Sequence, residues 1–218
     1  MNAMTRRVVL SGLLLLAACW GRGGLCAGQD CDAWTAVRET AEGRLFHRCR
    51  PGSPLAAVMI ETQFRAAPER LYALVNDYAA FADFIPDVAE SRVLAVDGAV
   101  QWVYHRLHLP GPVADRVYIL QSTASTQGVP PVAWRVEWTL AQRAFPGFDA
   151  GAGVRPDSLS GFWEIGADAA GTTRARYAVH VEPGGHLPVW LVQRMTDRYV
   201  QQVVAAVRGR LEERRARK

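Results

Sequence analysis

Residues 182–207 read EPGGHLPVWLVQRMTDRYVQQVVAAV, and this stretch decides the fold. It opens with a glycine turn, and Pro188 stands where a proline suits the start of a helix. Apolar residues then recur every three or four positions, which predicts a helix of more than about five turns with one apolar face. That predicted face carries Val192, Met195, Tyr199, Val203, Ala206 and Val207, and the opposite face carries Gln193, Arg194, Asp197 and Gln201.

The segments before this helix alternate between apolar and polar residues, as strands do. Gly, Pro and Asp turns separate them, so consecutive strands are predicted to pair in an antiparallel meander. The predicted strands are 45–50, 56–64, 91–97, 100–109, 113–122, 132–140, 159–165 and 172–182.

Shorter helices and one long loop complete the predicted elements. Trp34 and Val37 have helical spacing within residues 31–44, and Pro68 opens a second amphipathic segment that ends near Tyr78. Residues 142–158, rich in Gly, Pro and Phe, are too long for a hairpin and predict an Ω loop or a lid. The fold class is therefore α+β, with a curved antiparallel sheet that buries one face against the C-terminal helix.

Composition indicates one globular domain. The chain has 218 residues, of which 50% are hydrophobic and 21% charged, enough to bury a core. The net charge of +4 falls to about +2 if Arg6 and Arg7 are removed with a leader, which argues against nucleic acid as a partner. Basic residues end the last helix and form a tail at 215–218, which suits solvent or anionic lipid headgroups.

The N-terminus has the pattern of an export signal. Arg6 and Arg7 precede an apolar run of about 11 residues, a length typical of a signal peptide and too short to span a bilayer. Two processing routes within residues 1–27 remain open. Residues 16–19, LAAC, match a lipobox that would acylate Cys19, whereas cleavage after Ala27 would release a free protein. Either route leads to the periplasm.

All four cysteines lie in the first quarter of the chain, at positions 19, 26, 31 and 49. In an oxidising compartment Cys31 and Cys49 form a natural pair. Their disulfide would close a loop of about 19 residues and stabilise the fold by about 3 kcal/mol. Lipidation at Cys19 would leave Cys26 without a partner, whereas cleavage after Ala27 would not.

Several short motifs, in this order, resemble the START family of lipid-transfer proteins, part of the helix-grip or SRPBCC superfamily. The resemblance spans residues 31–214, and its most specific part is the stretch from Glu182 to Leu191. The other similar segments are GRLFHR at 43–48, PGS at 51–53, FIPDV at 84–88, LPGPVADR at 109–116 and GFW at 161–163. Phe84 stands where the family usually has Trp.

The resemblance implies a sheet that grips the C-terminal helix around a cavity for one sterol, phospholipid or similar hydrophobic molecule, without a cofactor or metal. It implies a monomeric binding or transfer protein that reaches membrane surfaces, with the loop at 142–158 as a gate. The candidate cavity residues are Trp102, Tyr104, Arg116, Trp138, Trp163, Tyr177, Met195 and Tyr199.

Motifs for catalysis are missing from the sequence. It contains no Gly-rich phosphate loop, no Gly-x-Ser-x-Gly elbow and no His/Cys pair with metal spacing. His105 and His108 fall on opposite faces of one predicted strand, so they are not expected to share a metal. We therefore expect a binding protein, not an enzyme. The alternatives are a cyclase or hydrolase of the same superfamily, and an interaction module with a collapsed cavity.

Overall fold

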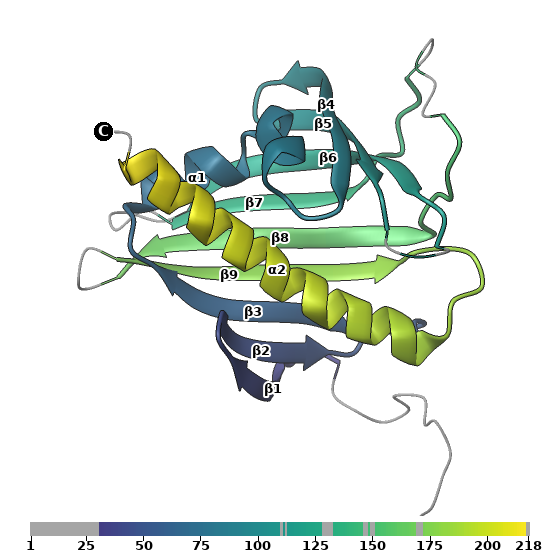
Figure 1. The fold of residues 1–218 in the computed structure, drawn as a ribbon, viewed down its shortest axis with the longest axis horizontal. Coiled ribbons are helices and arrows are strands. Elements are labelled where there is room, and N and C mark those ends of the chain that lie inside the picture. Colours follow the sequence, from purple (N-terminus) through teal and green to yellow (C-terminus); the bar gives the residue numbers. More distant parts are fainter. Residues whose placement is uncertain are drawn as a thin grey trace, which may run out of the picture.

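The computed structural model describes residues 31–109, 111, 113–127, 133–145, 148, 151–168 and 172–216. The predicted export segment, Cys19 and Cys26 lie outside the described residues. Within them, nine strands form one antiparallel sheet in the order β1-β2-β3-β9-β8-β7-β6-β5-β4, and a long helix crosses it (Figure 1). The α+β helix-grip fold predicted from the sequence is confirmed.

The observed elements follow the predicted order with shifted ends. The strands are β1 Thr35–Thr40, β2 Gly43–Arg48, β3 Ala57–Phe64, β4 Val88–Asp97, β5 Val100–Leu107, β6 Arg116–Gln127, β7 Ala133–Leu140, β8 Ser158–Ala167 and β9 Thr173–Glu182. The helices are α1 Pro68–Val75, the short 3₁₀ helix η1 Tyr78–Asp83, and α2 Val189–Ala216. The meander predicted from residue 91 onward is the run β4 to β9, since each of these strands pairs with the next.

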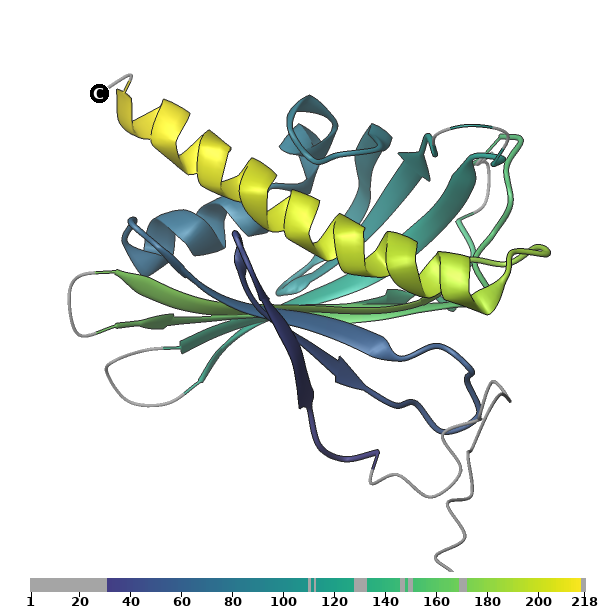
Figure 2. The same cartoon turned by 60° about the horizontal axis from the view of Figure 1, so that its bottom comes forward.

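Alternating side chains give the sheet two different faces. The inner face turns toward α2, and Figure 2 shows α1 and η1 on that same side. Val58, Ile60, Val136 and Ile165 are almost fully buried in the core between this face and the helices. The outer face carries charged pairs such as Arg135 with Glu137. The inner face is therefore the one that buries apolar side chains, and the outer face is the one that carries charge.

The first element differs from its prediction, because residues 35–40 form a strand rather than a helix. β1 pairs with β2 at the edge of the sheet, and nearly all of its side chains are exposed. Thr35, Val37 and Thr40 are β-branched and favour extended backbone. The spacing of Trp34 and Val37 was therefore a wrong indicator of a helix.

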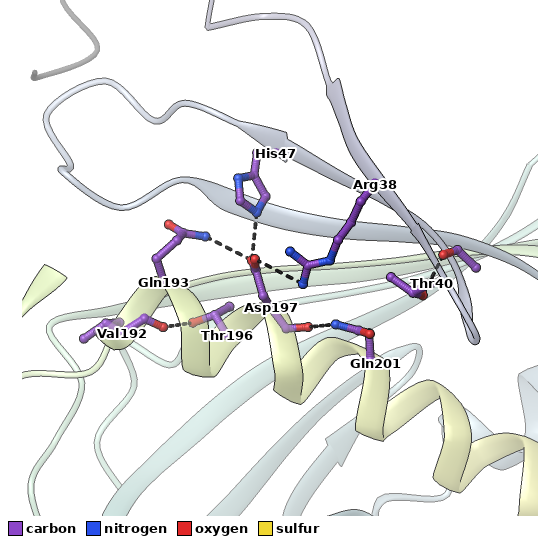
Figure 3. A network of polar contacts seen from close by, with 9 residues as sticks. Arg38, Thr40, His47, Val192, Gln193, Thr196, Asp197 and Gln201 are labelled. Carbon is purple, nitrogen blue, oxygen red and sulfur yellow. Dashed lines mark hydrogen bonds and ion pairs between the residues drawn. The ribbon is translucent and has the colours of Figure 1, made fainter. Parts of the chain in front are cut away.

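The buried face of α2 is also rotated from the predicted stripe. Thr196, Asp197 and Val200 are buried, whereas Met195, predicted to face the core, is only half-buried. Asp197, predicted to face solvent, is 8% exposed. Its carboxylate lies 2.7 Å from Nε2 of His47 and 3.7 Å from the guanidinium of Arg38 (Figure 3).

The disulfide between Cys31 and Cys49 forms as predicted, with the two Cα atoms 4.9 Å apart. It ties the segment before β1 to the end of β2. As a result Trp34 lies against Arg48, whose guanidinium carbon is 4.5 Å from the centre of the indole ring.

Candidate functional site

A cavity of about 70 Å³ lies between the inner face of the sheet and α2. The sheet supplies its floor, Tyr199, Val203 and Val207 of α2 cover it, and α1 and η1 close one end. The lining residues are Val75, Tyr78, Phe81, Ile85, Val88, His105, Tyr118, Leu120, Trp138, Leu159, Trp163, Tyr177, Tyr199, Val203 and Val207. Aromatic and aliphatic groups dominate this lining, as in most sites for hydrophobic ligands.

Stacked aromatic rings form the floor of the cavity. The rings of Trp163 and Tyr177 lie 4.5 Å apart and nearly parallel, and Trp138 lies 6.0 Å from Tyr177. Gly161 makes room for Trp138, because a Cβ at position 161 would lie 2.5 Å from the indole and 2.4 Å from the carbonyl oxygen of Ala178. The absence of a side chain at Gly161 thus allows this floor.

His105 brings a buried imidazole ring to the wall of the cavity. The residue is 5% exposed, and within the described part of the chain its Nε2 atom has no hydrogen-bond partner. Burial lowers the pKa of His105 to about 4, so the ring is neutral at pH 7. A buried polar nitrogen without a partner is costly, and a hydrogen bond from a bound molecule would remove that cost.

Tyrosine hydroxyl groups line the same space. Tyr78 shares a hydrogen bond of 2.7 Å with Ser122, whereas the hydroxyls of Tyr118, Tyr177 and Tyr199 bond to no other described residue. Burial raises the pKa of Tyr177 well above its ordinary value, and the neighbouring Tyr199, Tyr118 and Tyr78 raise it further. These hydroxyls stay protonated and can donate or accept a hydrogen bond.

No charged side chain belongs to this lining, which lies wholly within described segments. A carboxylate or ammonium group placed inside would therefore lack a counter-charge, at a cost of several kcal/mol. The arrangement suits an uncharged molecule with a large apolar surface and at least one hydrogen-bonding atom.

Comparison with known proteins agrees with this geometry. Residues 64–208, more than half of the chain, match the family described as polyketide cyclase / dehydrase and lipid transport. The chain belongs to this family. It is part of the START/SRPBCC superfamily, whose members bind lipids or other hydrophobic ligands in general.

Individual relatives of this family member are distant. An uncharacterized protein of Pseudomonas aeruginosa is 26% identical over 185 residues, covering 85% of this chain and 88% of that protein. The crystal structure of a STAR-related lipid transfer protein fragment from Xanthomonas axonopodis is also 26% identical, with a TM-score of 0.73 over 83% of this chain and 99% of the fragment. Human StAR-related lipid transfer protein 5 shares the fold at 13% identity, with a TM-score of 0.70 over 85% of this chain and 89% of that one.

Within this START-type fold, half of the predicted cavity residues do line the cavity. Trp138, Trp163, Tyr177 and Tyr199 contribute to its wall. Met195 does not, because the rotation of α2 directs Thr196 and Tyr199 inward instead. Whether the four lining residues contact a ligand stays a prediction.

Trp102 and Tyr104 lie on the outer face, contrary to the prediction. They are covered there by Phe145 and Phe148, with ring centres 6.3 Å and 5.0 Å apart in the two pairs. In strand β5 the even-numbered side chains point outward, so His105 rather than its neighbours reaches the cavity. Alternation along β5 shows that Tyr104 and His105 point to opposite faces of the sheet. It does not show which of the two points toward the cavity.

Arg116 is buried, but its side chain binds backbone carbonyl groups and does not line the cavity. Its guanidinium donates hydrogen bonds to the carbonyl oxygens of Ala114, Pro183 and Gly184, the last two in the turn before α2. Asp115, next to it, pairs with Arg106 and His108 near the surface. These contacts fix the position of the turn from which α2 starts.

The predicted gate at 142–158 also lies elsewhere. Its described residues pack on the outer face, where Phe145 covers Trp102 and the backbone of Val154 bonds to Asp115 and Val117. That is the side of the sheet opposite the cavity, so these residues do not cover the cavity. Elements that do close the cavity are α2 and η1.

The sequence patterns did not identify His105, Tyr78 and Tyr118 as cavity residues. Alternation along the strand leaves the facing of His105 open, and only the register of β5 with its neighbours places its side chain on the inner face. Tyr78 could have been found, because it continues the apolar stripe of Leu71, Leu74 and Val75 toward the cavity.

Two further observations concern the described residues only. No three His, Cys, Asp or Glu side chains among them gather where they could hold a metal ion. No helix in this part of the chain is long and apolar enough to cross a membrane.

Proposed function

We propose that this protein is an exported binding protein that carries an uncharged hydrophobic molecule between its sheet and α2. The observation that supports this most is the buried Nε2 of His105, which has no partner among the described residues and belongs to the lining of a cavity without charged side chains. A carbonyl or hydroxyl group of the ligand would bond to this nitrogen and to the free tyrosine hydroxyls. The aromatic floor would hold the rest of the molecule, flat rings above all.

The small size of the cavity implies that it opens to bind. Its volume of about 70 Å³ is far below the roughly 300 Å³ at which ligand pockets usually begin. The short helix η1 is the wall that we expect to move. It is joined to α2 by two ion pairs near the surface, Arg210 with Asp83 at 3.9 Å and Arg214 with the adjacent Asp77 at 3.4 Å, and such pairs contribute little binding energy.

Export is supported by the leader-like segment and by the disulfide. Disulfides persist outside the cytoplasm, where the Cys31–Cys49 pair would stabilise the first hairpin. We propose a periplasmic location with Cys19 acylated. The intact mass of the mature protein tests this: acyl chains on a protein that begins at Cys19 are expected, and an unacylated protein that begins at Gly28 would contradict it.

Ligand binding can be tested with two probes that differ mainly in charge. We expect 2-naphthol to quench the fluorescence of Trp138 and Trp163 as it binds, and 2-naphthoate to bind at least about ten-fold more weakly, because its carboxylate finds no counter-charge. Equal binding of both probes would contradict an uncharged ligand. Native mass spectrometry with lipid extracts provides the broader test, since a protein that takes up neither probe nor any lipid is not a carrier.

An enzyme is the second candidate, favoured by the same histidine. A neutral imidazole beside tyrosine hydroxyls could move a proton during a cyclisation. We propose binding without turnover, because no carboxylate or thiol lies among the lining residues. If a ligand from the native source is converted, and His105→Phe stops conversion while binding continues, the protein is an enzyme.

A further inference from the structure

The outer face of the sheet carries a second concave site, separated from the cavity under α2 by the sheet, although Trp138 lines both. A hollow of about 430 Å³ extends from Trp34 and Arg48 across the middle strands, and a hollow of about 280 Å³ adjoins it at the turn after β2. The two share Arg50, Ser160 and His180, so we treat them as one outer groove. α2, α1 and η1 all lie on the opposite side of the sheet (Figure 2).

Cationic side chains crowd this groove. Arg48 and Arg50 have no carboxylate within 4.0 Å in the described part of the chain. Burial lowers the pKa of Arg48, and the charge of Arg50 lowers it further. The same two causes, in the same order, lower the pKa of His180, which is 6% exposed. Each of these groups would gain from an anion placed between them.

Hydroxyl groups supplement the cations. Ser53 lies 3.3 Å from Nε2 of His180, and Ser160 stands opposite His180 in the pairing of β8 with β9. Ser158 lines the same hollow, and its hydroxyl is buried without a partner among the described residues. These groups can donate hydrogen bonds to several oxygens of one ligand.

The described carboxylates near the groove form no ion pair with Arg50. Glu137 is bound at 2.9 Å by Arg135, and Glu182 lies 4.0 Å from His180. Asp32 raises the pKa of Arg48, a weaker influence than burial or Arg50. Arg50 itself is exposed to solvent and has no ion-pair partner within the described residues.

Covalent and aromatic contacts fix the wall of the groove. The Cys31–Cys49 disulfide holds Trp34 against Arg48, with the guanidinium carbon 4.5 Å from the ring centre. Across the groove, Arg135 lies 4.3 Å from the ring of Phe162. Guanidinium groups held on aromatic rings lose little freedom when they bind a ligand.

We infer that the outer groove binds the phosphate group of a molecule, through Arg48, Arg50, His180 and the serine hydroxyls. Two guanidinium groups with several hydroxyl donors suit the oxygens of a phosphate better than the two oxygens of a carboxylate. The phosphate belongs either to a small phosphate ester or to the headgroup of an anionic lipid. In both cases Arg48, Arg50 and His180, which bind the phosphate, line no part of the cavity under α2.

The test uses the disulfide-bonded protein and two variants of equal charge. Arg50→Gln removes an exposed cation of the groove that has no ion-pair partner among the described residues. Arg174→Gln removes an exposed arginine of the same outer face that lines neither hollow. Inorganic phosphate is titrated by NMR of the backbone amides, with acetate as the carboxylate control. Thermal unfolding confirms that both variants fold.

We expect phosphate to shift the amides of residues 48–53 and 158–160, more strongly than acetate does. Arg50→Gln should weaken this binding by about ten-fold or more, equal to about 1.4 kcal/mol, whereas Arg174→Gln leaves it unchanged. No shift at millimolar phosphate, or equal losses in both variants, would overturn the inference. So would acetate binding as tightly as phosphate.

Vesicles distinguish the two sources of the phosphate group. If the source is a lipid headgroup, phosphatidylglycerol vesicles bind the protein, Arg50→Gln releases it, and glycerol phosphate competes. If it is a soluble ester, glycerol phosphate binds and the vesicles do not. Either result supports a phosphate site. Vesicle binding that Arg174→Gln reduces as much as Arg50→Gln does would show only general charge attraction, and would contradict a site in the groove.

Discussion

Single residues determine the shape and polarity of the cavity. Gly161 leaves room for Trp138 in the floor, and His105 brings to the wall a buried ring nitrogen that has no partner among the described residues. Neither role follows from residue type alone. Glycine in a strand usually weakens it, and histidine in a strand is often exposed, so the role of each depends on its neighbours across the sheet.

Gly161→Ala should destabilise the protein by about 1–3 kcal/mol, because the new methyl group collides with Trp138 and with the backbone of Ala178. Urea unfolding measures the loss, and tryptophan fluorescence shows whether the floor has moved. Gly166→Ala is the matched control, since a Cβ at this position of β8 meets nothing within 4 Å. Equal stability of the two variants would mean that Trp138 moves aside without cost.

His105 should make the protein lose stability as the pH falls from about 6.5 to about 4. Its pKa in the folded protein is lowered by burial to about 4, so between these values the unfolded chain binds a proton that the folded one does not. His105→Gln should flatten this part of the pH profile by up to about 3 kcal/mol.

The comparison of His105→Gln with the unmodified protein isolates the contribution of this ring. His180 has a lowered pKa too and contributes in the same direction, so the difference between variant and unmodified protein is the quantity to compare. Identical profiles for His105→Gln and the unmodified protein would show that this ring is not buried in the neutral form.

Contacts between elements determine how α2 is fixed over the sheet. Near its start, Asp197 bonds to His47 of β2 and to Gln193 of its own helix (Figure 3). Near its end, Arg208 bonds to Glu42 and to Thr62. The helix is thus tied to the edge hairpin β1–β2 and to β3, whereas its polar contacts with η1 are the ion pairs of Arg210 with Asp83 and of Arg214 with Asp77.

Asp197→Ala should cost about 2–4 kcal/mol of stability, because it leaves the partly buried His47 without its acceptor. Asp197→Asn should cost less, since its amide oxygen can still accept the hydrogen bond and Arg38 is half exposed and 3.7 Å away. Chemical denaturation of both variants separates the two contributions. If Asn costs as much as Ala, the charge rather than the hydrogen bond holds the helix.

For the whole molecule, binding requires the small cavity to open while α2 stays attached to β1–β3. We therefore expect η1 to move as a unit away from the C-terminal half of α2. The pairs of Arg210 with Asp83 and of Arg214 with Asp77 link η1 to α2, and the hydrogen bonds of Tyr78 with Ser122 and Ser91 link it to the sheet.

The double substitution Arg210→Ala, Arg214→Ala should speed the entry and exit of 2-naphthol several-fold. It should lower the melting temperature only slightly, because surface ion pairs contribute little stability and the half-buried Arg210 loses some packing on Phe84. Stopped-flow tryptophan fluorescence measures both rates. Arg194→Ala with Arg198→Ala is the control, since both are exposed on α2 and have no ion-pair partner among the described residues. If both double variants exchange the probe equally fast, another wall opens.

Much of the element order could be predicted from local patterns. The strands β2 to β9, α1 and α2 appear close to their predicted positions, because period-two and period-3.6 patterns depend on neighbouring residues alone. The pairing of Cys31 with Cys49 was equally accessible, since the two cysteines are the pair nearest to the globular domain. The exception was β1, an exposed edge strand whose few apolar residues do not form a pattern.

The sequence by itself determined the elements other than β1, the helix-grip class and the disulfide, whereas only the tertiary structure decided which side chains point into the core. Alternation along β5 separates Tyr104 from His105, but aromatic residues are stable on either side once residues 145 and 148 cover the outer face. Likewise, the charge of Asp197 predicts an exposed position on α2. In the fold, His47 of β2 lies 2.7 Å from its carboxylate and helps to bury it. Burial of a side chain depends on what covers it, and that partner comes from a distant part of the chain.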